Sequence, residues 1–364
     1  MKLGILTAGG DCPGLNAALR AAGKTLLGHG HELIGFEDGF LGILEERYRQ
    51  ILVSDLSGIL TIGGTILGSS NRDNPFMWSP GHGPNNAGEQ SDHSDNVAEI
   101  IRRLDIDGLI VIGGDGSMNI ANRLNKEKGI PCIGVPKTID NDLGCTDVTF
   151  GFDTAMQLAT ECIDRLHSTA MSHHRAMVVE IMGRYTGWLT LHAGVAGGAD
   201  VILIPEIPYN VDHVCATILK RSRVGKRFSI IAVSEGAKPI GGKLTVSKIV
   251  ADSPDPIRLG GIAQHLADEI ETATGVESRA TILGHIQRGG SPSAQDRILS
   301  TGFGYKAAEL ALNGEWGKMA ALKCGQFIGV NISDAISNLR CVPSDHELIV
   351  AARAIGTCFG DSDC

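Results

Sequence analysis

The sequence lacks several features that mark particular classes of protein. Its nine cysteines include no Cys-x-x-Cys pair and are odd in number, so neither a disulfide framework nor a zinc knuckle is expected, and a reducing compartment fits best. Aromatic residues make up only 4% of the chain and the formal net charge is −9, a composition that disfavours base-stacking platforms and nonspecific binding to nucleic acid or anionic membranes. No apolar run approaches the length needed to span a bilayer. We therefore expect a cytoplasmic protein that binds neither nucleic acid nor membrane.

The usual P-loop for nucleoside triphosphates is also missing. Gly23-Lys24-Thr25 has Ala18 where the first glycine of the motif belongs, and it lies within a helix-like pattern. Gly241-Gly242-Lys243 is followed by Leu244 instead of serine or threonine. A Walker-type NTPase is therefore disfavoured.

What the sequence does contain is a regular alternation of short apolar runs and amphipathic stretches. With 364 residues and 43% hydrophobic content, the chain is long enough for two ordinary domains with cores of their own. The predicted buried strands are Leu3–Thr7, Gly108–Ile112, Cys132–Val135, Met177–Ile181, Val201–Ile204, Ser229–Val233 and Thr281–Leu283. The predicted helices are Leu15–Leu27, Asn96–Leu104, Thr154–His167, Val211–Arg221, Leu259–Thr274 and Ala294–Leu312. This order predicts an α/β protein with two Rossmann-like domains, in which parallel sheets are flanked by helices and ligands lie at the carboxyl ends of the strands.

Two segments interrupt this alternation. Asn71–Gln90 is rich in proline, glycine and asparagine and has no periodicity, which predicts an exposed loop or a lid near a nucleotide. Lys238–Pro256 has a similar composition and is interpreted as a second insertion. For both segments a loop without a function is an equally good interpretation.

Two glycine-rich turns of similar form follow apolar runs and open helix-like patterns. They are Gly9–Ala17 and Gly113–Ala121. A strand that ends in two glycines and an aspartate can turn tightly, present bare N–H groups to an anion and add the positive end of the following helix. A carboxylate beside phosphate needs a cation between them, so Asp115 is a candidate magnesium ligand. The two turns together predict phosphoryl transfer.

A third motif, Pro136–Asp142, follows directly after a predicted buried strand. Asp140 and Asp142 are separated by one residue, so one carboxylate can accept a proton from an attacking hydroxyl while the other tunes its field or helps to hold the metal. A turn with solvated aspartates is the plainer interpretation of this motif taken alone.

These motifs and several later ones resemble the 6-phosphofructokinase family over nearly the whole chain. The NAD and diacylglycerol kinases share a Gly-Gly-Asp-Gly turn, but they would not explain the segments around positions 138, 182 and 283. The matching segments are Gly9–Ala17, Gly63–Ser70, Gly113–Ser117, Thr138–Asp142, Gly151–Ala155, Met182–Tyr185, Glu235 and Leu283–Pro292.

The resemblance implies a role for each matching residue in phosphorylating fructose 6-phosphate at its 1-hydroxyl. Asp140 resembles the general base, Asp115 the ligand of Mg²⁺ and Asp142 its acidic neighbour. The catalytic set that the resemblance implies is Asp140, Arg184, Arg72, Gly10 and Thr138. The implied sugar-phosphate set is Thr138, Asp142, Arg175, Met182, Gly183, Arg184, Glu235, Arg279, His285 and Arg288. The implied nucleotide set is Gly10, Arg72, Gly114, Asp115, Gly116 and Ser117.

Two positions bear on the phosphoryl donor, which in this family is ATP or inorganic pyrophosphate. Gly116 is typical of ATP users, because an aspartate there would add bulk and negative charge where the α-phosphate sits. Lys137 is typical of pyrophosphate users. A flexible lysine can swing aside or contact a nucleotide phosphate, whereas exclusion by an aspartate is hard to reverse, so the prediction favours ATP.

The resemblance also implies an organisation for the whole molecule. Arg175 and Arg279 match arginines that reach the 6-phosphate from a neighbouring subunit, which implies a homodimer or homotetramer. The implied donor-binding domain comprises 1–151 and about 288–340, and the implied fructose 6-phosphate domain comprises 152–287 and about 341–364. Two alternatives are a noncatalytic subunit that senses sugar phosphate, which would not need the full catalytic set, and a periplasmic-type sugar-binding protein, which should carry an export signal and stacking aromatics.

Overall fold

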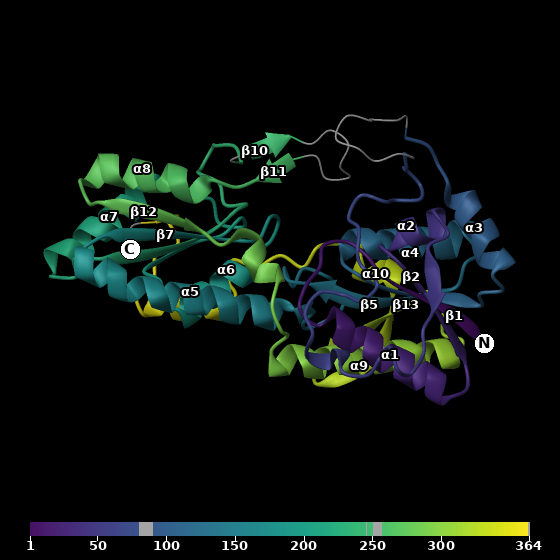
Figure 1. Ribbon diagram of the computed structural model, residues 1–364. Helices are drawn as coiled ribbons and strands as arrows, with labels where there is room; N and C mark the ends of the chain where they lie inside the picture. The colour runs from purple at the N-terminus through teal and green to yellow at the C-terminus, as the bar shows by residue number, and fades with distance from the viewer. Residues whose placement is uncertain (80–89, 245, 250–256, 363–364) are drawn as a thin grey trace. The chain divides into compact units, whose positions relative to one another are not determined.

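The computed structural model describes residues 1–79, 90–244, 246–249 and 257–362, and within them the chain forms two compact units (Figure 1). The first unit holds the described part of Met1–Thr154 together with Arg288–Leu339. The second holds the described part of Ala155–Ala251, Asp255–Gln287 and Arg340–Cys364. Each unit therefore combines segments that are far apart in the sequence.

The first unit is built on an eight-stranded sheet. Its strands are β1 (Lys2–Thr7), β2 (Glu32–Phe36), β3 (Tyr48–Gln50), β4 (Gly108–Gly113), β5 (Cys132–Thr138), β6 (Phe150–Gly151), β13 (Lys318–Lys323) and β14 (Gln326–Asn331). The order is β14-β13-β5-β4-β1-β2-β3, with β6 beside β5. The central strands β13, β5, β4, β1 and β2 are parallel, and the outer strands β14 and β3 are antiparallel to their neighbours. Parallel strands buried on both faces consist of apolar runs, as β4 does, since all its residues are buried.

Helices cover both faces of this sheet. They are α1 (Leu15–Gly28), α2 (Phe40–Leu44), α3 (Ser94–Arg103), α4 (Asp115–Lys128), α9 (Ala294–Leu312) and α10 (Ile332–Ala335), with a short 3₁₀ turn at Ile59–Thr61. Figure 1 shows α1 and α9 along one face and α2, α3 and α4 along the other. Alternate strand residues such as Leu109 and Val111 join a core with α3 and α4, because successive side chains of a strand point to opposite faces.

The second unit has a four-stranded parallel sheet in the order β12-β7-β9-β8. Its strands are β7 (Ala176–Ile181), β8 (Val201–Leu203), β9 (Ser229–Ser234) and β12 (Ser278–Ile282), and β10 (Val246–Ile249) pairs antiparallel with β11 (Ile257–Leu259) elsewhere. The helices are α6 (Trp188–Ala196), α7 (Val211–Arg223), α8 (Ile262–Thr274), α11 (Glu347–Ala354) and most of α5 (Phe152–His173), with a 3₁₀ turn at Gly284–Arg288. The apolar faces of α7 and α8 pack on one side of the sheet. On the other side α6 approaches closely at Gly194, which contacts Ile202 and Ala232.

Several predicted boundaries are wrong. The helix predicted at Leu259–Thr274 begins at Ile262, because Leu259 belongs to β11 and two glycines with positive φ, Gly260 and Gly261, separate the two elements. The strand predicted at Thr281–Leu283 is Ser278–Ile282, whose first residues are polar.

The two predicted insertions are described only in part. Residues 80–89 of the first, and 245 and 250–256 of the second, lie outside the described residues. The first is not simply an exposed loop, because Phe76 and Trp78 are buried in the core of the first unit. Part of the second forms the β10–β11 pair.

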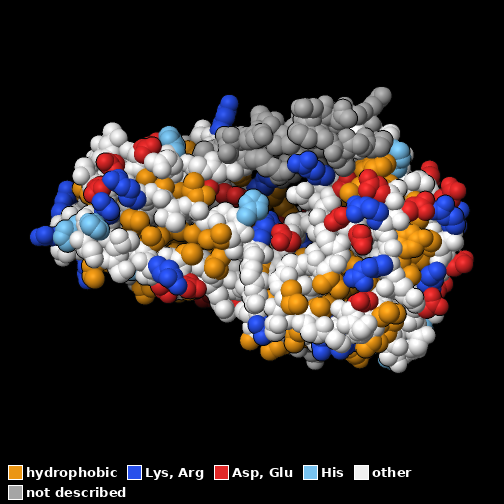
Figure 2. Space-filling model, in the orientation of Figure 1, with side chains coloured by type: hydrophobic (Ala, Val, Ile, Leu, Met, Phe, Trp, Pro, Cys, Tyr) orange, Lys and Arg blue, Asp and Glu red, His pale blue; other side chains and the backbone are white. Residues whose placement is uncertain are grey.

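No helix in the described part of the chain combines the length and apolarity that crossing a bilayer requires. On the face shown in Figure 2, acidic and basic side chains of the first unit are interspersed with one another.

Candidate active site

The first glycine turn lies at the carboxyl end of β1 and lines a cavity of about 430 Å³. Gly9 has a φ of 81°, a left-handed conformation that favours glycine, and its N–H donates to the Ser70 carbonyl at 2.9 Å. The Ser69 hydroxyl donates back to the Gly9 carbonyl at 2.6 Å. These two bonds fix the turn against a second loop. The cavity is lined by Gly9, Gly10, Asp11, Gly64, Thr65, Ser69, Ser70, Asn71 and Arg72.

The second glycine turn joins β4 to the N-terminus of α4. No side chain caps this end of the helix, so its first N–H groups are available to an anion. Ser117 is buried and packs under Gly113, where a side chain on the glycine would clash with it at 2.3 Å. A Cβ on Gly116 would meet nothing within 4 Å, and Gly116 does not have a positive φ. Neither packing nor backbone conformation therefore requires a glycine at position 116.

The loop after β5 holds Asp140 and Asp142 in a fixed backbone conformation. Asn141 between them has a φ of 53°, and its side-chain oxygen accepts the Thr149 N–H at 3.0 Å. The Asp140 N–H donates to the Thr138 hydroxyl at 3.0 Å. In the sheet β5, β4 and β1 are parallel neighbours, so the loop and both glycine turns emerge at the same edge.

The carboxylates at this edge are poorly solvated. The pKa of Asp142 is raised to about 7, mainly by burial and in addition by the negative charges of Asp140 and Asp115, although a hydrogen bond from Thr138 opposes the rise. Burial likewise raises the pKa of Asp115. The Asp142 Oδ1 atom is buried and has no hydrogen-bond partner among the described residues. A cation near this atom would relieve both the repulsion and the missing hydrogen bond.

These residues fit Mg²⁺ better than a metal ion whose ligands are all protein side chains. Among the described residues no cluster of three or more His, Cys, Asp or Glu side chains is arranged to hold a metal ion. Mg²⁺ in phosphoryl-transfer sites is held by one or two carboxylates and completes its shell with phosphate oxygens and water. Asp115 matches that requirement, because it is half-buried and its Oδ1 receives a long 3.3 Å hydrogen bond from the Asn119 amide.

Lys137 differs from the flexible side chain that we expected. It lies in β5, its side chain is buried, and its ammonium group donates to the Gly10 carbonyl. Burial lowers the pKa of this lysine, and nearby carboxylates including Asp11 and Asp140 oppose that effect. The ammonium group of Lys137 is therefore held beneath the first glycine turn by its bond to the Gly10 carbonyl.

Two arginines lie beside the first glycine turn. Arg72 is exposed and lines the cavity. Arg288 donates from Nη1 to the Asp11 carbonyl at 3.1 Å. A Cβ atom on Gly10 would lie only 2.6 Å from this Nη1 and would clash with it. Gly10 therefore allows close approach of a cation to the turn.

In the second unit, a separate group of predicted residues gathers at the carboxyl ends of three adjacent strands. Met182, Gly183 and Arg184 follow β7, Glu235 follows β9, and His285 follows β12. The Gly183 carbonyl accepts from the Ser234 hydroxyl at 2.5 Å and from the Gly236 N–H at 3.1 Å, which joins the first two loops.

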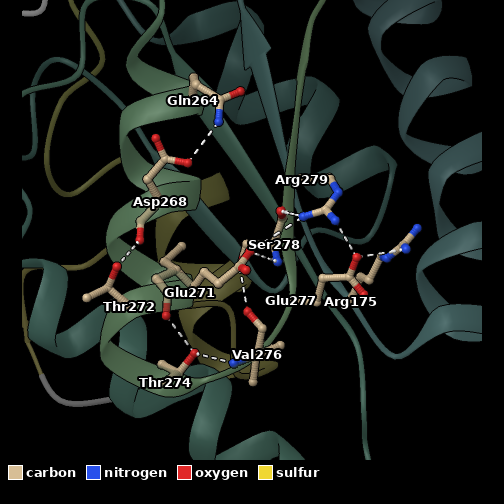
Figure 3. Close-up of polar contacts among 11 residues, drawn as sticks. Arg175, Gln264, Asp268, Glu271, Thr272, Thr274, Val276, Glu277, Ser278 and Arg279 are labelled. Atoms are coloured by element: carbon tan, nitrogen blue, oxygen red, sulfur yellow. Dashed lines mark hydrogen bonds and ion pairs between the residues drawn. The ribbon is translucent and has the colours of Figure 1, made fainter.

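Arg175 and Arg279 lie at the opposite edge of that sheet. Arg175 precedes β7 and Arg279 is the second residue of β12. Figure 3 shows both guanidinium groups directed toward Glu277, which is 2.8 Å from Arg175 Nη2 and also pairs with Arg279. Since six strand residues span roughly 20 Å, these arginines cannot join Met182 and Glu235 of the same chain at one phosphate.

Comparison with known proteins identifies the family of this chain. The family model described as phosphofructokinase matches residues 2–311. The chain belongs to the phosphofructokinase family. It is 49% identical over 362 residues to ATP-dependent 6-phosphofructokinase 2 of Clostridium perfringens, covering 99% of this chain and 98% of that protein. It is 48% identical over 345 residues to pyrophosphate–fructose 6-phosphate 1-phosphotransferase of Amycolatopsis mediterranei, covering 94% of this chain and 96% of that protein.

Solved phosphofructokinase structures share the fold. The phosphofructokinase of Pichia pastoris in the T-state matches with a TM-score of 0.78 and 30% identity over 92% of this chain, which spans only 37% of that longer chain. A pyrophosphate-dependent phosphofructokinase from Marinobacter aquaeolei matches with a TM-score of 0.79 over 96% of this chain and 88% of that one, and its 22% identity supports the fold alone. The predicted α/β fold is confirmed.

Sequence reasoning gave no role to several residues that line the cavity, above all Thr65, Ser69 and Ser70. The sequence signal that could have found them is the Gly63–Ser70 motif, which contains all three residues. The burial of Asp73, three residues after Ser70, has no comparable signal, since an aspartate in a loop is ordinarily exposed.

Proposed function

We propose that this chain is a 6-phosphofructokinase that transfers the terminal phosphoryl group of ATP to the 1-hydroxyl of fructose 6-phosphate, forming fructose 1,6-bisphosphate in glycolysis. The observation that carries the proposal is the meeting of two uncapped glycine turns and a paired-aspartate loop at one edge of the first unit's sheet. Membership of the phosphofructokinase family supports the same activity.

The residues of the first unit divide the chemistry among themselves. Asp140 accepts the proton of the attacking hydroxyl. Thr138 orients Asp140, because its hydroxyl oxygen accepts the Asp140 N–H. Gly10, Gly114, Ser117 and Arg72 bind the donor phosphates and balance the charge that develops on the transferring group. Asp115 would hold Mg²⁺ with Asp142 beside it, and the ion supplies further neutralisation of the phosphate oxygens.

The second unit and Arg288 bind the acceptor. Glu235 accepts hydrogen bonds from sugar hydroxyls, Met182, Gly183 and His285 contact the sugar phosphate, and Arg184 neutralises the transferring phosphoryl group. Arg175 and Arg279 bind the 6-phosphate of the sugar held by a neighbouring subunit. Their position at the far edge of the sheet supports this role. Their pairs with Glu277 are partly exposed and contribute little stability, so a phosphate can replace the carboxylate. A phosphate site completed by a second copy of the chain requires a homo-oligomer. Sedimentation velocity that showed an active monomer would contradict this role of the two arginines.

The choice of donor depends on local residues, because relatives of both kinds share almost the same identity with this chain. The open space beside Gly116 favours ATP, since nothing among the described residues requires a glycine there. Lys137 supports pyrophosphate use as the alternative. It is bound to the Gly10 carbonyl, however, where its charge favours the phosphates of either donor and excludes neither.

The test compares fructose 1,6-bisphosphate formation with ATP and with pyrophosphate, each with Mg²⁺. The wild-type protein should have a kcat/KM at least about tenfold higher with ATP, and Gly116→Asp should lower the ATP value by about tenfold or more while sparing the pyrophosphate value, through charge repulsion at the α-phosphate. Gly28→Asp, at another glycine with open space and no positive φ, is the matched control and should change neither. A wild-type preference for pyrophosphate would refute ATP as the donor, and an unchanged ratio in Gly116→Asp would refute the role of position 116.

A further inference from the structure

Asp73 is a buried carboxylate next to Arg72, and nothing in the proposed chemistry uses it. It is 6% exposed and lies between Arg72 and the buried pair Phe76 and Trp78. Burying a carboxylate is costly unless hydrogen bonds compensate, so its partners show what it holds in place.

The two oxygens of Asp73 accept hydrogen bonds from the side chains of Ser70 and Trp78, among other contacts. The Ser70 hydroxyl donates to Oδ2, and the Trp78 indole N–H donates to Oδ1 at 3.2 Å. The Ser70 oxygen in turn accepts the Arg72 N–H at 3.3 Å. The Asp73 carboxylate therefore fixes the Ser70 hydroxyl, which accepts the backbone N–H of Arg72.

The same loop is bound to the first glycine turn. The Ser70 carbonyl accepts the Gly9 N–H at 2.9 Å, and the Thr7 hydroxyl donates to the Gly68 carbonyl at 2.6 Å. A shift of Ser70 would therefore move one wall of the 430 Å³ cavity and the backbone that carries Arg72.

The opposite end of this set of contacts is anchored to the core. Trp78 is 8% exposed and exchanges two backbone hydrogen bonds of 2.9 Å with Ser91. Its ring meets His93, the residue before α3, edge to face with 5.0 Å between centroids. Trp78 thus gives Asp73 a rigid support.

We propose that Asp73 is a positioning residue for donor binding, holding Ser70 and through it Arg72 and the Gly9 turn in the geometry that receives the donor phosphates. The inference rests on the proposed function, since it assigns this cavity to the donor. An exposed arginine loses conformational entropy when it binds phosphate, and a fixed backbone reduces that loss. Asp73 acts on donor affinity and leaves the acceptor untouched.

The test measures KM for ATP and for fructose 6-phosphate, and the dissociation constant of Mg-ATP by calorimetry without the sugar. Asp73→Ala and Ser70→Ala should raise the KM and dissociation constant for ATP by about tenfold while the fructose 6-phosphate KM stays within about twofold. Asp73→Asn, which keeps an acceptor for Trp78, should recover part of the loss. Asp95→Asn is the control, because the Asp95 side chain is 90% exposed and pairs with Lys128 at the surface.

Each outcome of these measurements either supports or overturns the role proposed for Asp73. Two variants remove a donor to Asp73: Ser70→Ala removes the hydroxyl that also accepts the Arg72 N–H, and Trp78→Phe removes the indole N–H. Donor constants within twofold of wild type in both variants would overturn the proposal even if Asp73→Ala failed to fold. Equal changes in both KM values would also overturn it, because they would reflect a general structural defect. Wild-type protein that binds ATP without turning over the sugar would refute the proposed activity, and the ATP dissociation constants of the variants would still test Asp73.

Discussion

At the scale of single residues, the structure changes how the predicted site residues are understood. The sequence placed Asp140 and Asp142 one residue apart. It could not show that Asn141 adopts a left-handed conformation or that Asp142 Oδ1 has no hydrogen-bond partner in the described part of the chain. These properties depend on contacts with Thr149 and on burial, which come from residues outside the motif. The roles of individual residues in catalysis remain predictions.

The raised pKa of Asp142 predicts how stability depends on pH. With a pKa of about 7 in the folded protein and about 3.8 in the unfolded chain, the folded state keeps a proton that the unfolded state loses between these values. The free energy of unfolding should therefore fall as pH rises from about 4 to about 7 and then level off, by an amount on the order of a few kcal/mol. Asp142→Asn should remove this fall.

Urea unfolding without Mg²⁺ at pH 5 and pH 8 measures the effect. The gain in stability of Asp142→Asn over wild type should be larger at pH 8, whereas the exposed Asp95→Asn should differ from wild type equally at both values. An equal gain for Asp142→Asn at the two pH values would contradict the account of its burial.

At the scale of helices and strands, periodicity predicted most of the parallel strands and the main amphipathic helices, but it missed β2, whose residues are mostly buried. The helix α6 escaped prediction because it is largely buried, so its residues Trp188–Ala196 have little amphipathic contrast. The antiparallel edge strands β3 and β14 were also missed, since their residues are mostly exposed or half-buried. Burial by other elements, which sequence periodicity does not report, decided these cases.

The start of α5 provides a test at this scale. Asp296 of α9 is fully buried and accepts the Gly151 N–H at 2.9 Å, the Thr154 N–H at 2.8 Å and the Thr154 hydroxyl at 2.5 Å. Asp296→Ala should lower the free energy of unfolding by about 2–4 kcal/mol, because it leaves several buried donors unsatisfied. Asn210→Ala, which removes an exposed cap from α7, should cost about 1 kcal/mol. Equal losses in denaturant unfolding would show that Asp296 is an ordinary cap.

At the scale of the whole molecule, the fold was predictable from the alternation of elements, whereas the choice of donor was not predictable from overall similarity. Relatives named for ATP and for pyrophosphate are 49% and 48% identical to this chain. The central claim concerns the edge of the first unit's sheet, where one carboxylate is placed to accept a proton beside two phosphate-binding turns. Everything else proposed for the second unit depends on that chemistry.

The most direct measurement is the steady-state formation of fructose 1,6-bisphosphate from ATP and fructose 6-phosphate by wild type and Asp140→Asn. Removing a general base should lower kcat by about 10²–10⁴-fold and change both KM values only a few-fold. Asp147→Asn, on the same loop and paired with Lys323 at the surface, should keep wild-type turnover. Turnover by Asp140→Asn within about tenfold of wild type would contradict the account.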